Sequence, residues 1–277
     1  MDITHVALAM TDAADAEIRP RFRALAEGDI ALKGPNDYVT EADKNAEIFL
    51  TKRLREIVDV PVVGEEATAE NPALPDLLAD ASAAWVVDPV DGTYHFVHGS
   101  ETYAVMVAYM EAGVATAGWI LHPETGDLYI GVRGKGATLN GKPIPVRVVG
   151  DEASSGRTLG TLRGVASARY IDPDARYALL EAQASIGEIA EPRMCAGWDY
   201  ADLLQGTTDY VLFSRTHAWD HAPAAAIVRE AGFTIRRLDG SDYLPGVQGA
   251  PLLTAPNEIW PDVADALASR VSVTPRA

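Results

Sequence analysis

The sequence has little cysteine, few basic residues and no long apolar run, and each shortage excludes a class of protein. A single cysteine, Cys195, among 277 residues excludes a framework of disulfide bonds. No apolar run approaches the roughly 18 residues of a membrane-spanning helix. The formal charge of -17 disfavours nonspecific binding to nucleic-acid polymers or to an anionic membrane. With no internal repeat and no charged-then-apolar N-terminal signal, we expect a globular cytoplasmic protein.

The stretch from Trp85 to Gly99 combines a strand signal with two acidic residues and a glycine. Trp85 to Val87 reads as a buried strand, and Pro89 is expected to end it because proline lacks a backbone donor. Asp88 and Asp91 would then lie on a strand-to-helix turn. Two carboxylates so close must repel each other or share a cation, and Mg²⁺ prefers oxygen ligands. The alternative is that these residues only cap the turn and the helix.

Gly92 and Thr93 follow this acidic pair at the expected start of a helix. A glycine there allows a phosphate to approach backbone N–H groups at the positive end of the helix dipole. One turn would thus offer metal ligands beside an anion site.

Further acidic residues occur at the ends of other expected elements. A short strand, Val60 to Val63, leads to Glu65 and Glu66, which could also be solvated turn charges. Asp220 is expected to be the N-cap of a helix from about His221 to Ala231, a role that by itself explains an aspartate. A zinc site at His217 and His221 is an alternative, although the pair straddles the helix start.

The rest of the chain alternates helices and strands in a way that suggests α/β layering. Thr40 and Asp43 form a variant of the capping box that opens a helix. Cys195 reads as a small core residue. The expected helices are an N-terminal one to about Ala26, interrupted near Pro20, then Glu41 to Val58, Asp174 to Ser185 and Trp198 to Gln205. The expected strands are Tyr103 to Met110, Val114 to Leu121, Leu128 to Val132 and Tyr210 to Phe213, with turns at residues 34–37 and a hairpin at Asn140-Gly141.

Four motifs occur in order along the chain. They are Asp37-Tyr38-Val39-Thr40-Glu41-Ala42-Asp43, Gly64-Glu65-Glu66, Asp88-Pro89-Val90-Asp91-Gly92-Thr93, and Trp219-Asp220 followed by Glu230-Ala231-Gly232-Phe233. Together they resemble the inositol monophosphatase family, and the first is similar to an element shared by the wider lithium-sensitive, magnesium-dependent phosphatase superfamily. The resemblance extends over nearly the whole chain.

This resemblance implies a fold and an assembly. The fold would be a layered α-β-α-β-α sandwich. Residues 1–148 would form an α+β half on an antiparallel sheet that carries the metal motifs. Residues 149–277 would form an α/β half on a mixed sheet that supplies Asp220 and the substrate side. A homodimer is implied as well.

The resemblance also implies a metal-dependent phosphomonoesterase. Glu65, Asp88 and the carbonyl of Val90 would hold one Mg²⁺, and Asp88, Asp91 and Asp220 a second, with a third, weaker ion near Glu65. The attacking water would lie near Glu65 and Thr93, and the N–H groups of Gly92 and Thr93 would bind the phosphate. Asp37, Thr40 and Asp43 would form the lithium-related motif. A noncatalytic regulator that binds a phosphorylated ligand is the alternative class, and the intact Glu65 and Thr93 argue against it.

The departures from the family pattern concern the substrate side, where Tyr94, Ala196, Trp198 and Phe213 are expected. Phe213 stands where inositol-specific members carry a glutamate that bonds ring hydroxyls, although Phe213 could simply pack its strand. Tyr94-His95 and Trp198-Asp199 replace smaller or amide residues. Aromatic side chains could stack on an imidazole or a purine. The substrate is therefore a small phosphorylated metabolite that could be an inositol phosphate, histidinol phosphate, fructose 1,6-bisphosphate or adenosine 3′,5′-bisphosphate.

Overall fold

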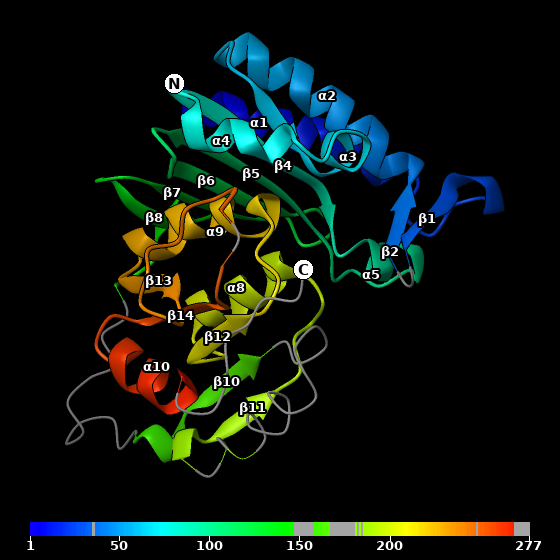
Figure 1. The fold of residues 1–277 in the computed structure, drawn as a ribbon. Coiled ribbons are helices and arrows are strands. Elements are labelled where there is room, and N and C mark those ends of the chain that lie inside the picture. Colours follow the sequence, from blue (N-terminus) through cyan, green and yellow to red (C-terminus); the bar gives the residue numbers. More distant parts are fainter. Residues whose placement is uncertain are drawn as a thin grey trace.

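Helices and sheets alternate as layers, and this confirms the predicted five-layer α-β-α-β-α sandwich (Figure 1). The computed structural model describes residues 1–34, 37–146, 158–166, 181, 183, 185–247 and 249–268. The boundary expected near residue 148 and most of the helix expected at 174–185 lie outside these residues, so both stay predictions.

The first layer consists of α1 (Ile3–Ala13) and α2 (Glu41–Ile57), which pack on one face of the larger sheet. The Asp2 carboxylate caps α1, which continues as a π-helical turn, Ala14–Ile18, and so ends well before Ala26. The predicted capping box at the start of α2 is confirmed, because Thr40 and Asp43 bond each other's backbone. Buried Leu50 lies further along the face of α2 that meets the sheet.

The larger sheet has seven strands in the order β3-β4-β5-β6-β7-β8-β9. β3 pairs with β4 in parallel, so the sheet is not wholly antiparallel as the resemblance implied. β4 runs through Pro89 to Asp91, which corrects the expectation that Pro89 ends it. The register shifts between Asp88 and Asp91, so the missing donor of Pro89 falls where the ladder is already interrupted. The strands are β3 (Val62–Gly64), β4 (Ala83–Asp91), β5 (Ala104–Glu111), β6 (Val114–His122), β7 (Asp127–Val132), β8 (Gly136–Leu139) and β9 (Lys142–Pro143).

The middle layer holds α8 (Ala196–Gln205) and α9 (Ala218–Glu230), between the two sheets (Figure 1). α9 lies directly on the larger sheet, where only glycine leaves room for its backbone. A Cβ at Gly118 would lie 2.0 Å from the Pro223 carbonyl oxygen, and one at Gly131 would lie 2.4 Å from the Cα of Ile227. This close packing holds α9 against β6 and β7.

The smaller sheet has five strands in the order β11-β10-β12-β14-β13 and is mixed, as expected. Its strands are β10 (Arg163–Ala166), β11 (Glu188–Ala190), β12 (Tyr210–Phe213), β13 (Phe233–Arg237) and β14 (Leu252–Pro256), and α10 (Trp260–Ala268) packs on it as the last layer. The remaining elements are β1 (Ile30–Gly34), β2 (Asp37–Thr40), α3 (Glu65–Glu70), α4 (Leu77–Asp80), α5 (Thr93–Val97) and the 3-10 turns η2 (Glu27–Asp29), η3 (Leu74–Asp76) and η4 (Leu159–Thr161).

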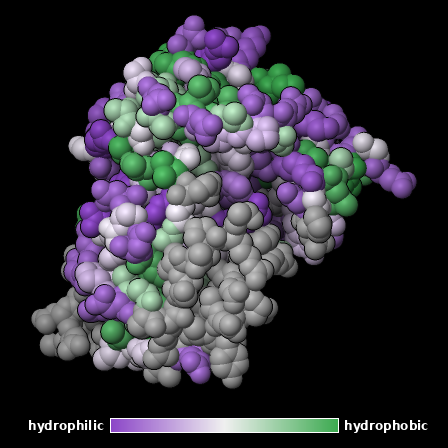
Figure 2. All heavy atoms as spheres, viewed as in Figure 1, coloured by the Kyte–Doolittle hydropathy of each residue, from purple (hydrophilic) through white to green (hydrophobic). Residues whose placement is uncertain are grey.

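Hydrophilic residues cover much of the described surface in the view of Figure 2, with apolar side chains in small groups between them. Among the residues that the structure describes, no helix combines the length and the apolar character needed to cross a membrane.

Candidate active site

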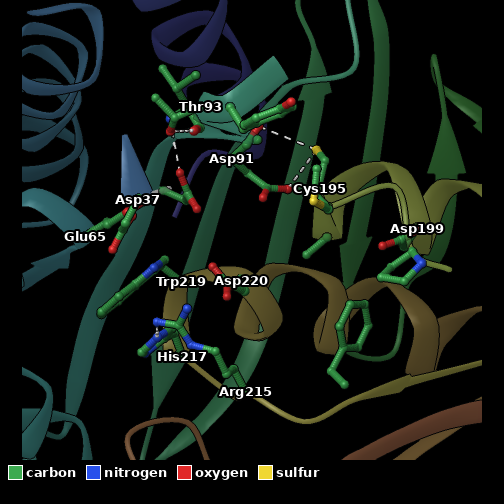
Figure 3. A pocket seen from close by; sticks show the side chains of 18 of the residues that line it. Asp37, Glu65, Asp91, Thr93, Cys195, Asp199, Arg215, His217, Trp219 and Asp220 are labelled. Carbon is green, nitrogen blue, oxygen red and sulfur yellow. Dashed lines mark hydrogen bonds between the residues drawn. The ribbon is translucent and has the colours of Figure 1, made fainter. Parts of the chain in front are cut away.

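A cavity of about 1280 Å³ opens where β4 ends, between α5 and the first turn of α9 (Figure 3). Its walls come from β1, β4, α5, the segment 191–196 and α9, so both halves of the chain contribute. All four motifs found in the sequence supply residues to it, namely Asp37, Glu65, Asp88, Val90 to Thr93, and Trp219 with Asp220.

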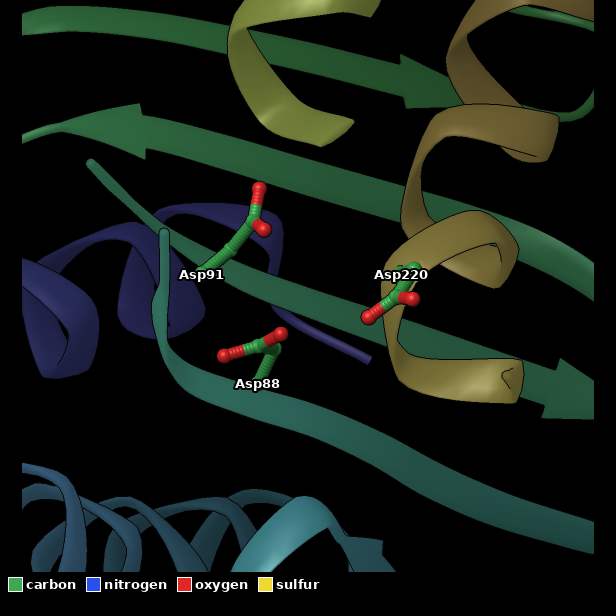
Figure 4. Close-up of side chains that lie close together, drawn as sticks. All are labelled: Asp88, Asp91 and Asp220. Atoms are coloured by element: carbon green, nitrogen blue, oxygen red, sulfur yellow. The ribbon is translucent and has the colours of Figure 1, made fainter. Parts of the chain in front are cut away.

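Three carboxylates meet in this cavity (Figure 4). Asp88, Asp91 and Asp220 each place an oxygen within 4.8 Å of the others. β4 carries the first two, on either side of its register shift, and α9 carries the third. The N-cap of α9 is His217, so Asp220 lies inside the first turn and is not the N-cap that the sequence suggested. Its carboxylate is therefore available to the cavity.

Burial makes this carboxylate cluster costly unless a cation joins it. Burial raises the pKa values of Asp88 and Asp220 well above their usual range, and the neighbouring carboxylates raise them further. Burial also raises the pKa of Asp91 to about 6, although the hydrogen bond from the N–H group of Gly197 lowers it. A set of oxygen donors without nitrogen or sulfur suits a hard divalent ion such as Mg²⁺. These residues therefore fit the metal that the family resemblance implies.

The Asp91 carboxylate is held by the N-cap and the first turn of α8. Its Oδ2 accepts the N–H of Gly197 at 2.6 Å and the Cys195 thiol at 3.1 Å. Burial, and then Asp91 itself, raises the pKa of Cys195 well above its usual value, so the thiol keeps the proton that it donates. Cys195 is indeed buried, as expected, but it also orients a proposed metal ligand, which the sequence analysis missed.

Glu65 is the first residue of α3 and lines the cavity beside the carboxylate cluster. Lys33 on β1 donates to Glu65 Oε1 at 2.5 Å and to Glu66 Oε1 at 3.0 Å. Burial by itself would lower the pKa of Lys33, but the two carboxylates outweigh it and raise that pKa. Lys33 is thus a charged ammonium at the cavity wall, a feature the sequence analysis did not identify because β1 and α3 are far apart in the chain.

Thr93 and Asp43 form a pair that the sequence placed in two different motifs. The Thr93 hydroxyl lies 3.0 Å from Asp43 Oδ1 and 2.9 Å from the carbonyl oxygen of Val90, both of which can accept its proton. The other Asp43 oxygen accepts the N–H of Thr40 at 2.9 Å and its hydroxyl at 2.5 Å. Burial raises the pKa of Asp43 to about 7, although the bonds from Thr40 lower it. The expected lithium motif therefore contacts the residue proposed to hold the water.

Gly92 adopts a conformation and a site that suit glycine only. Its φ is +86°, and a Cβ there would lie 2.9 Å from the carbonyl oxygen of Thr102 and 3.1 Å from the Cβ of Cys195. It is the N-cap of α5, so the predicted glycine at a helix start is confirmed. Gly92 and Thr93 both line the cavity next to Asp91.

The expected substrate residues are only partly brought together. Tyr94 lines the cavity, is 39% exposed and stacks on His98 with ring centroids 4.2 Å apart. Ala196 lines it too. Phe213 borders the cavity, and its ring also packs against that of Tyr200, with ring centroids 5.3 Å apart. The side chain therefore both lines the cavity and packs its strand.

Trp198 is the exception, because it does not line the cavity. Its indole N–H donates to the carbonyl oxygen of Tyr103, and its ring stacks on His122 at 4.1 Å. This side chain faces β5 and β6, so the expected contact with substrate does not fit its position.

The two histidines considered for zinc are already engaged. The nitrogens of His221 lie 3.0 Å from the Tyr200 hydroxyl and 2.9 Å from the carbonyl oxygen of Arg215. His217 lies 2.8 Å from an Arg215 Nη atom and stacks on Trp219. Burial lowers their pKa values to about 4 for His217 and about 3 for His221. Within the described part of the chain, no group of three close metal-binding side chains includes either histidine.

The sequence matches the family model described as the inositol monophosphatase family over residues 2–272. The chain belongs to the inositol monophosphatase family. It is 30% identical over 267 residues to the probable inositol 1-monophosphatase ImpA of Mycobacterium tuberculosis, covering 95% of this chain and 93% of that protein. It is 30% identical over 199 residues to a histidinol-phosphatase of Chlorobaculum parvum, covering 70% of each.

A solved inositol monophosphatase (IMPase) from Thermotoga maritima superposes with a TM-score of 0.78 at 22% identity, covering 98% of both chains. At that identity the likeness establishes the fold. Family membership adds the class of reaction, so the chain is a phosphoric monoester hydrolase.

Proposed function

We propose that this member of the inositol monophosphatase family hydrolyses a small phosphorylated alcohol by means of Mg²⁺-activated water. The observation that carries the proposal is the group of three carboxylates within 4.8 Å of one another, the buried Asp88 and Asp91 and the partly buried Asp220. Glu65 and the Val90 carbonyl line the same cavity and would complete the ligands for two ions, with a third, weaker ion near Glu65. The positive charge of Mg²⁺ would activate water and stabilise the leaving oxygen.

The chain's own residues would orient the water and the phosphate. The Thr93 hydroxyl can accept a hydrogen bond from the water while it donates its own proton to Asp43. Glu65, which lines the same cavity, would also hold the water. The N–H groups of Gly92 and Thr93 would bind the phosphate oxygens, whose charge redistributes as the ester bond breaks.

The cavity walls favour an alcohol other than a plain polyol. Phe213 offers no acceptor for a hydroxyl. Tyr94 presents an exposed aromatic ring beside the proposed phosphate cradle, with Tyr38 edge-on to it at 6.0 Å. An imidazole or a purine could stack there. Histidinol phosphate and adenosine 3′,5′-bisphosphate are therefore candidates beside inositol 1-phosphate and fructose 1,6-bisphosphate.

A turnover screen of these four esters with Mg²⁺ tests the proposal. We expect phosphate release from at least one ester, with an ester that carries an aromatic group giving a higher kcat/KM than inositol 1-phosphate. Release from none of them would contradict the phosphatase assignment. A preference for inositol 1-phosphate would contradict only the proposed selectivity.

Glu65→Gln should lower kcat by about 10² to 10⁴ while changing KM little, since orientation and activation of the water matter in the transition state. Stopped assays of phosphate release over a range of substrate concentrations separate the two constants. Glu66→Gln is the matched control, because Glu66 shares the Lys33 ammonium but is not a proposed ligand. An effect on KM alone, or an equal effect in both variants, would remove Glu65 from the proposed mechanism.

Lithium should inhibit at millimolar order if the motif of Asp37, Thr40 and Asp43 acts as the family resemblance implies. The physical reason is that Li⁺ would replace the more weakly held Mg²⁺ after turnover, and Asp43 of this motif contacts Thr93 in the site. Steady-state rates are compared in LiCl and in KCl of equal ionic strength. Identical rates in the two salts would contradict this prediction.

The family resemblance supports two further proposals, a homodimer and a division into halves at residues 148 and 149. We also propose that the protein acts in the cytoplasm on a free metabolite, without a membrane or nucleic-acid partner.

A further inference from the structure

Glu47 is a buried carboxylate on the face of α2 that points toward the active-site turns. Only 6% of the residue is exposed, and it lies one helical turn after Asp43. Buried apolar residues, Ala46 and Leu50, lie beside it on the same face. An apolar side chain would be the ordinary choice there, because burying a charge without partners is costly. A carboxylate at this position therefore needs hydrogen-bond donors that offset the cost of its burial.

Those partners are backbone N–H groups of α3, the short helix that begins with Glu65. Glu47 Oε2 accepts the N–H of Glu66 at 2.8 Å, and Oε1 accepts the N–H of Ala67 at 2.8 Å. N–H groups in the first turn of a helix have no acceptor within their own helix. Glu47 thus caps α3 from a different helix and bonds the two residues that follow Glu65.

Gly64 shows how closely the Glu47 carboxylate approaches this turn. A Cβ at Gly64 would lie 2.3 Å from Cδ of Glu47 and 2.4 Å from each of its carboxylate oxygens. The φ of Gly64 is −102°, which other residues adopt readily, so the glycine serves close approach and not an unusual turn. Gly64 and Glu47 are therefore a matched pair.

Helix α2, which carries Glu47, also contacts Thr93, the other residue proposed to hold the water. Asp43, in the first turn of α2, bonds Thr93, while Glu47, in the next turn, bonds the backbone after Glu65. Residues four apart lie on one face of a helix. Thr93 and Glu65, the two residues proposed to hold the attacking water, are therefore both positioned by the same helix, α2.

We propose that Glu47 is a positioning residue, which fixes the turn that carries Glu65 through the N–H groups of Glu66 and Ala67 and so sets the affinity of the site for Mg²⁺. The proposal rests on the role of Glu65 given under the proposed function. Glu47 itself does not line the cavity, so it acts through the backbone of α3.

Calorimetric titration of Mg²⁺ into the full chain without substrate tests this role. Glu47→Gln keeps the size of the side chain but leaves one acceptor oxygen for two N–H groups. We expect its Mg²⁺ affinity to fall about 10- to 100-fold, as for other groups that orient metal ligands. Glu56→Gln, an exposed change on the same helix, should bind Mg²⁺ like the wild type. Saturating Mg²⁺ should restore most of the phosphatase rate of Glu47→Gln, which general damage to the fold would not allow.

Equal Mg²⁺ affinity in folded Glu47→Gln and Glu56→Gln would overturn the proposal. Amide hydrogen exchange in the wild type provides a measurement that needs no variant. The N–H groups of Glu66 and Ala67 should be protected without metal, and rapid exchange at both would also overturn it. If the wild type binds Mg²⁺ but hydrolyses no phosphate ester, the proposed function fails, whereas the role of Glu47 is still decided by these two measurements.

Discussion

Asp88→Asn should lower the phosphatase rate at limiting Mg²⁺ by more than about 100-fold. Loss of a group that only orients a metal ligand already lowers metal affinity or activity by about 10- to 100-fold, and Asp88 is proposed to be a ligand itself. Asp88 is proposed to bridge two ions, and it is almost wholly buried beside Asp91 and Asp220. Steady-state rates over a range of Mg²⁺ concentrations measure the effect. Asp220→Asn should also lose most activity, but with a smaller loss of Mg²⁺ affinity, since Asp220 is proposed to serve one ion.

The same substitution should leave the protein folded and no less stable in the absence of metal. Asparagine keeps an oxygen in the place of Asp88 Oδ1, which accepts the N–H of Val90 at 3.1 Å, and it removes one of three mutually repelling charges. Circular dichroism and thermal unfolding in a chelator provide this comparison, with the exposed Asp12→Asn as control. A folded Asp88→Asn enzyme that works near the wild-type rate at low Mg²⁺ would refute the assignment of this cluster as the metal site.

Phe213→Glu should raise the preference for inositol 1-phosphate over an imidazole- or purine-bearing ester by about five- to 150-fold. A buried hydroxyl without a partner costs about 1 to 3 kcal/mol. Each 1.4 kcal/mol or so corresponds to a factor of ten in kcat/KM. Phe213 borders the cavity, so a carboxylate there could accept hydrogen bonds from a polyol ring. The quantity to measure is the ratio of kcat/KM for the two substrates, because a general loss of stability lowers both.

Phe213→Leu is the control, since Phe213 also packs against Tyr200 and His221. It removes the aromatic ring without adding an acceptor. A ratio that changes equally in both variants would mean that packing, and not the missing acceptor, sets the preference. An unchanged ratio in Phe213→Glu would place the specificity elsewhere in the cavity.

Much of the site could be predicted because its signals are local in the chain. Gly92 at the start of α5 and the capping box of Thr40 and Asp43 depend on neighbours within a few residues, and both are confirmed. Asp88 and Asp91 could be placed together because they are only three positions apart in the sequence. The position of Asp220 beside them could be predicted only from the family resemblance. It depends on the packing of α9 against the glycines of β6 and β7, which are distant in the chain.

Other features depend on contacts between distant segments, which a single sequence does not reveal. Trp198 could not be assigned to the core, because its partners Tyr103 and His122 belong to other elements. Lys33 and Cys195 reach their carboxylates across more than 30 and 100 residues, respectively. Glu47 did have a local signal, since it lies four residues after Asp43 and these two are the only acidic residues among the buried residues of α2, the others being apolar.

Phosphate release in ¹⁸O-labelled water, by enzyme stripped with a chelator and then supplied with Mg²⁺, tests the central claim most directly. The account predicts no release before Mg²⁺ is added. After the addition, each phosphate should carry one ¹⁸O atom from water and the alcohol should carry none. Release without Mg²⁺, or label in the alcohol, would contradict attack on phosphorus by water activated at the cluster of Asp88, Asp91 and Asp220.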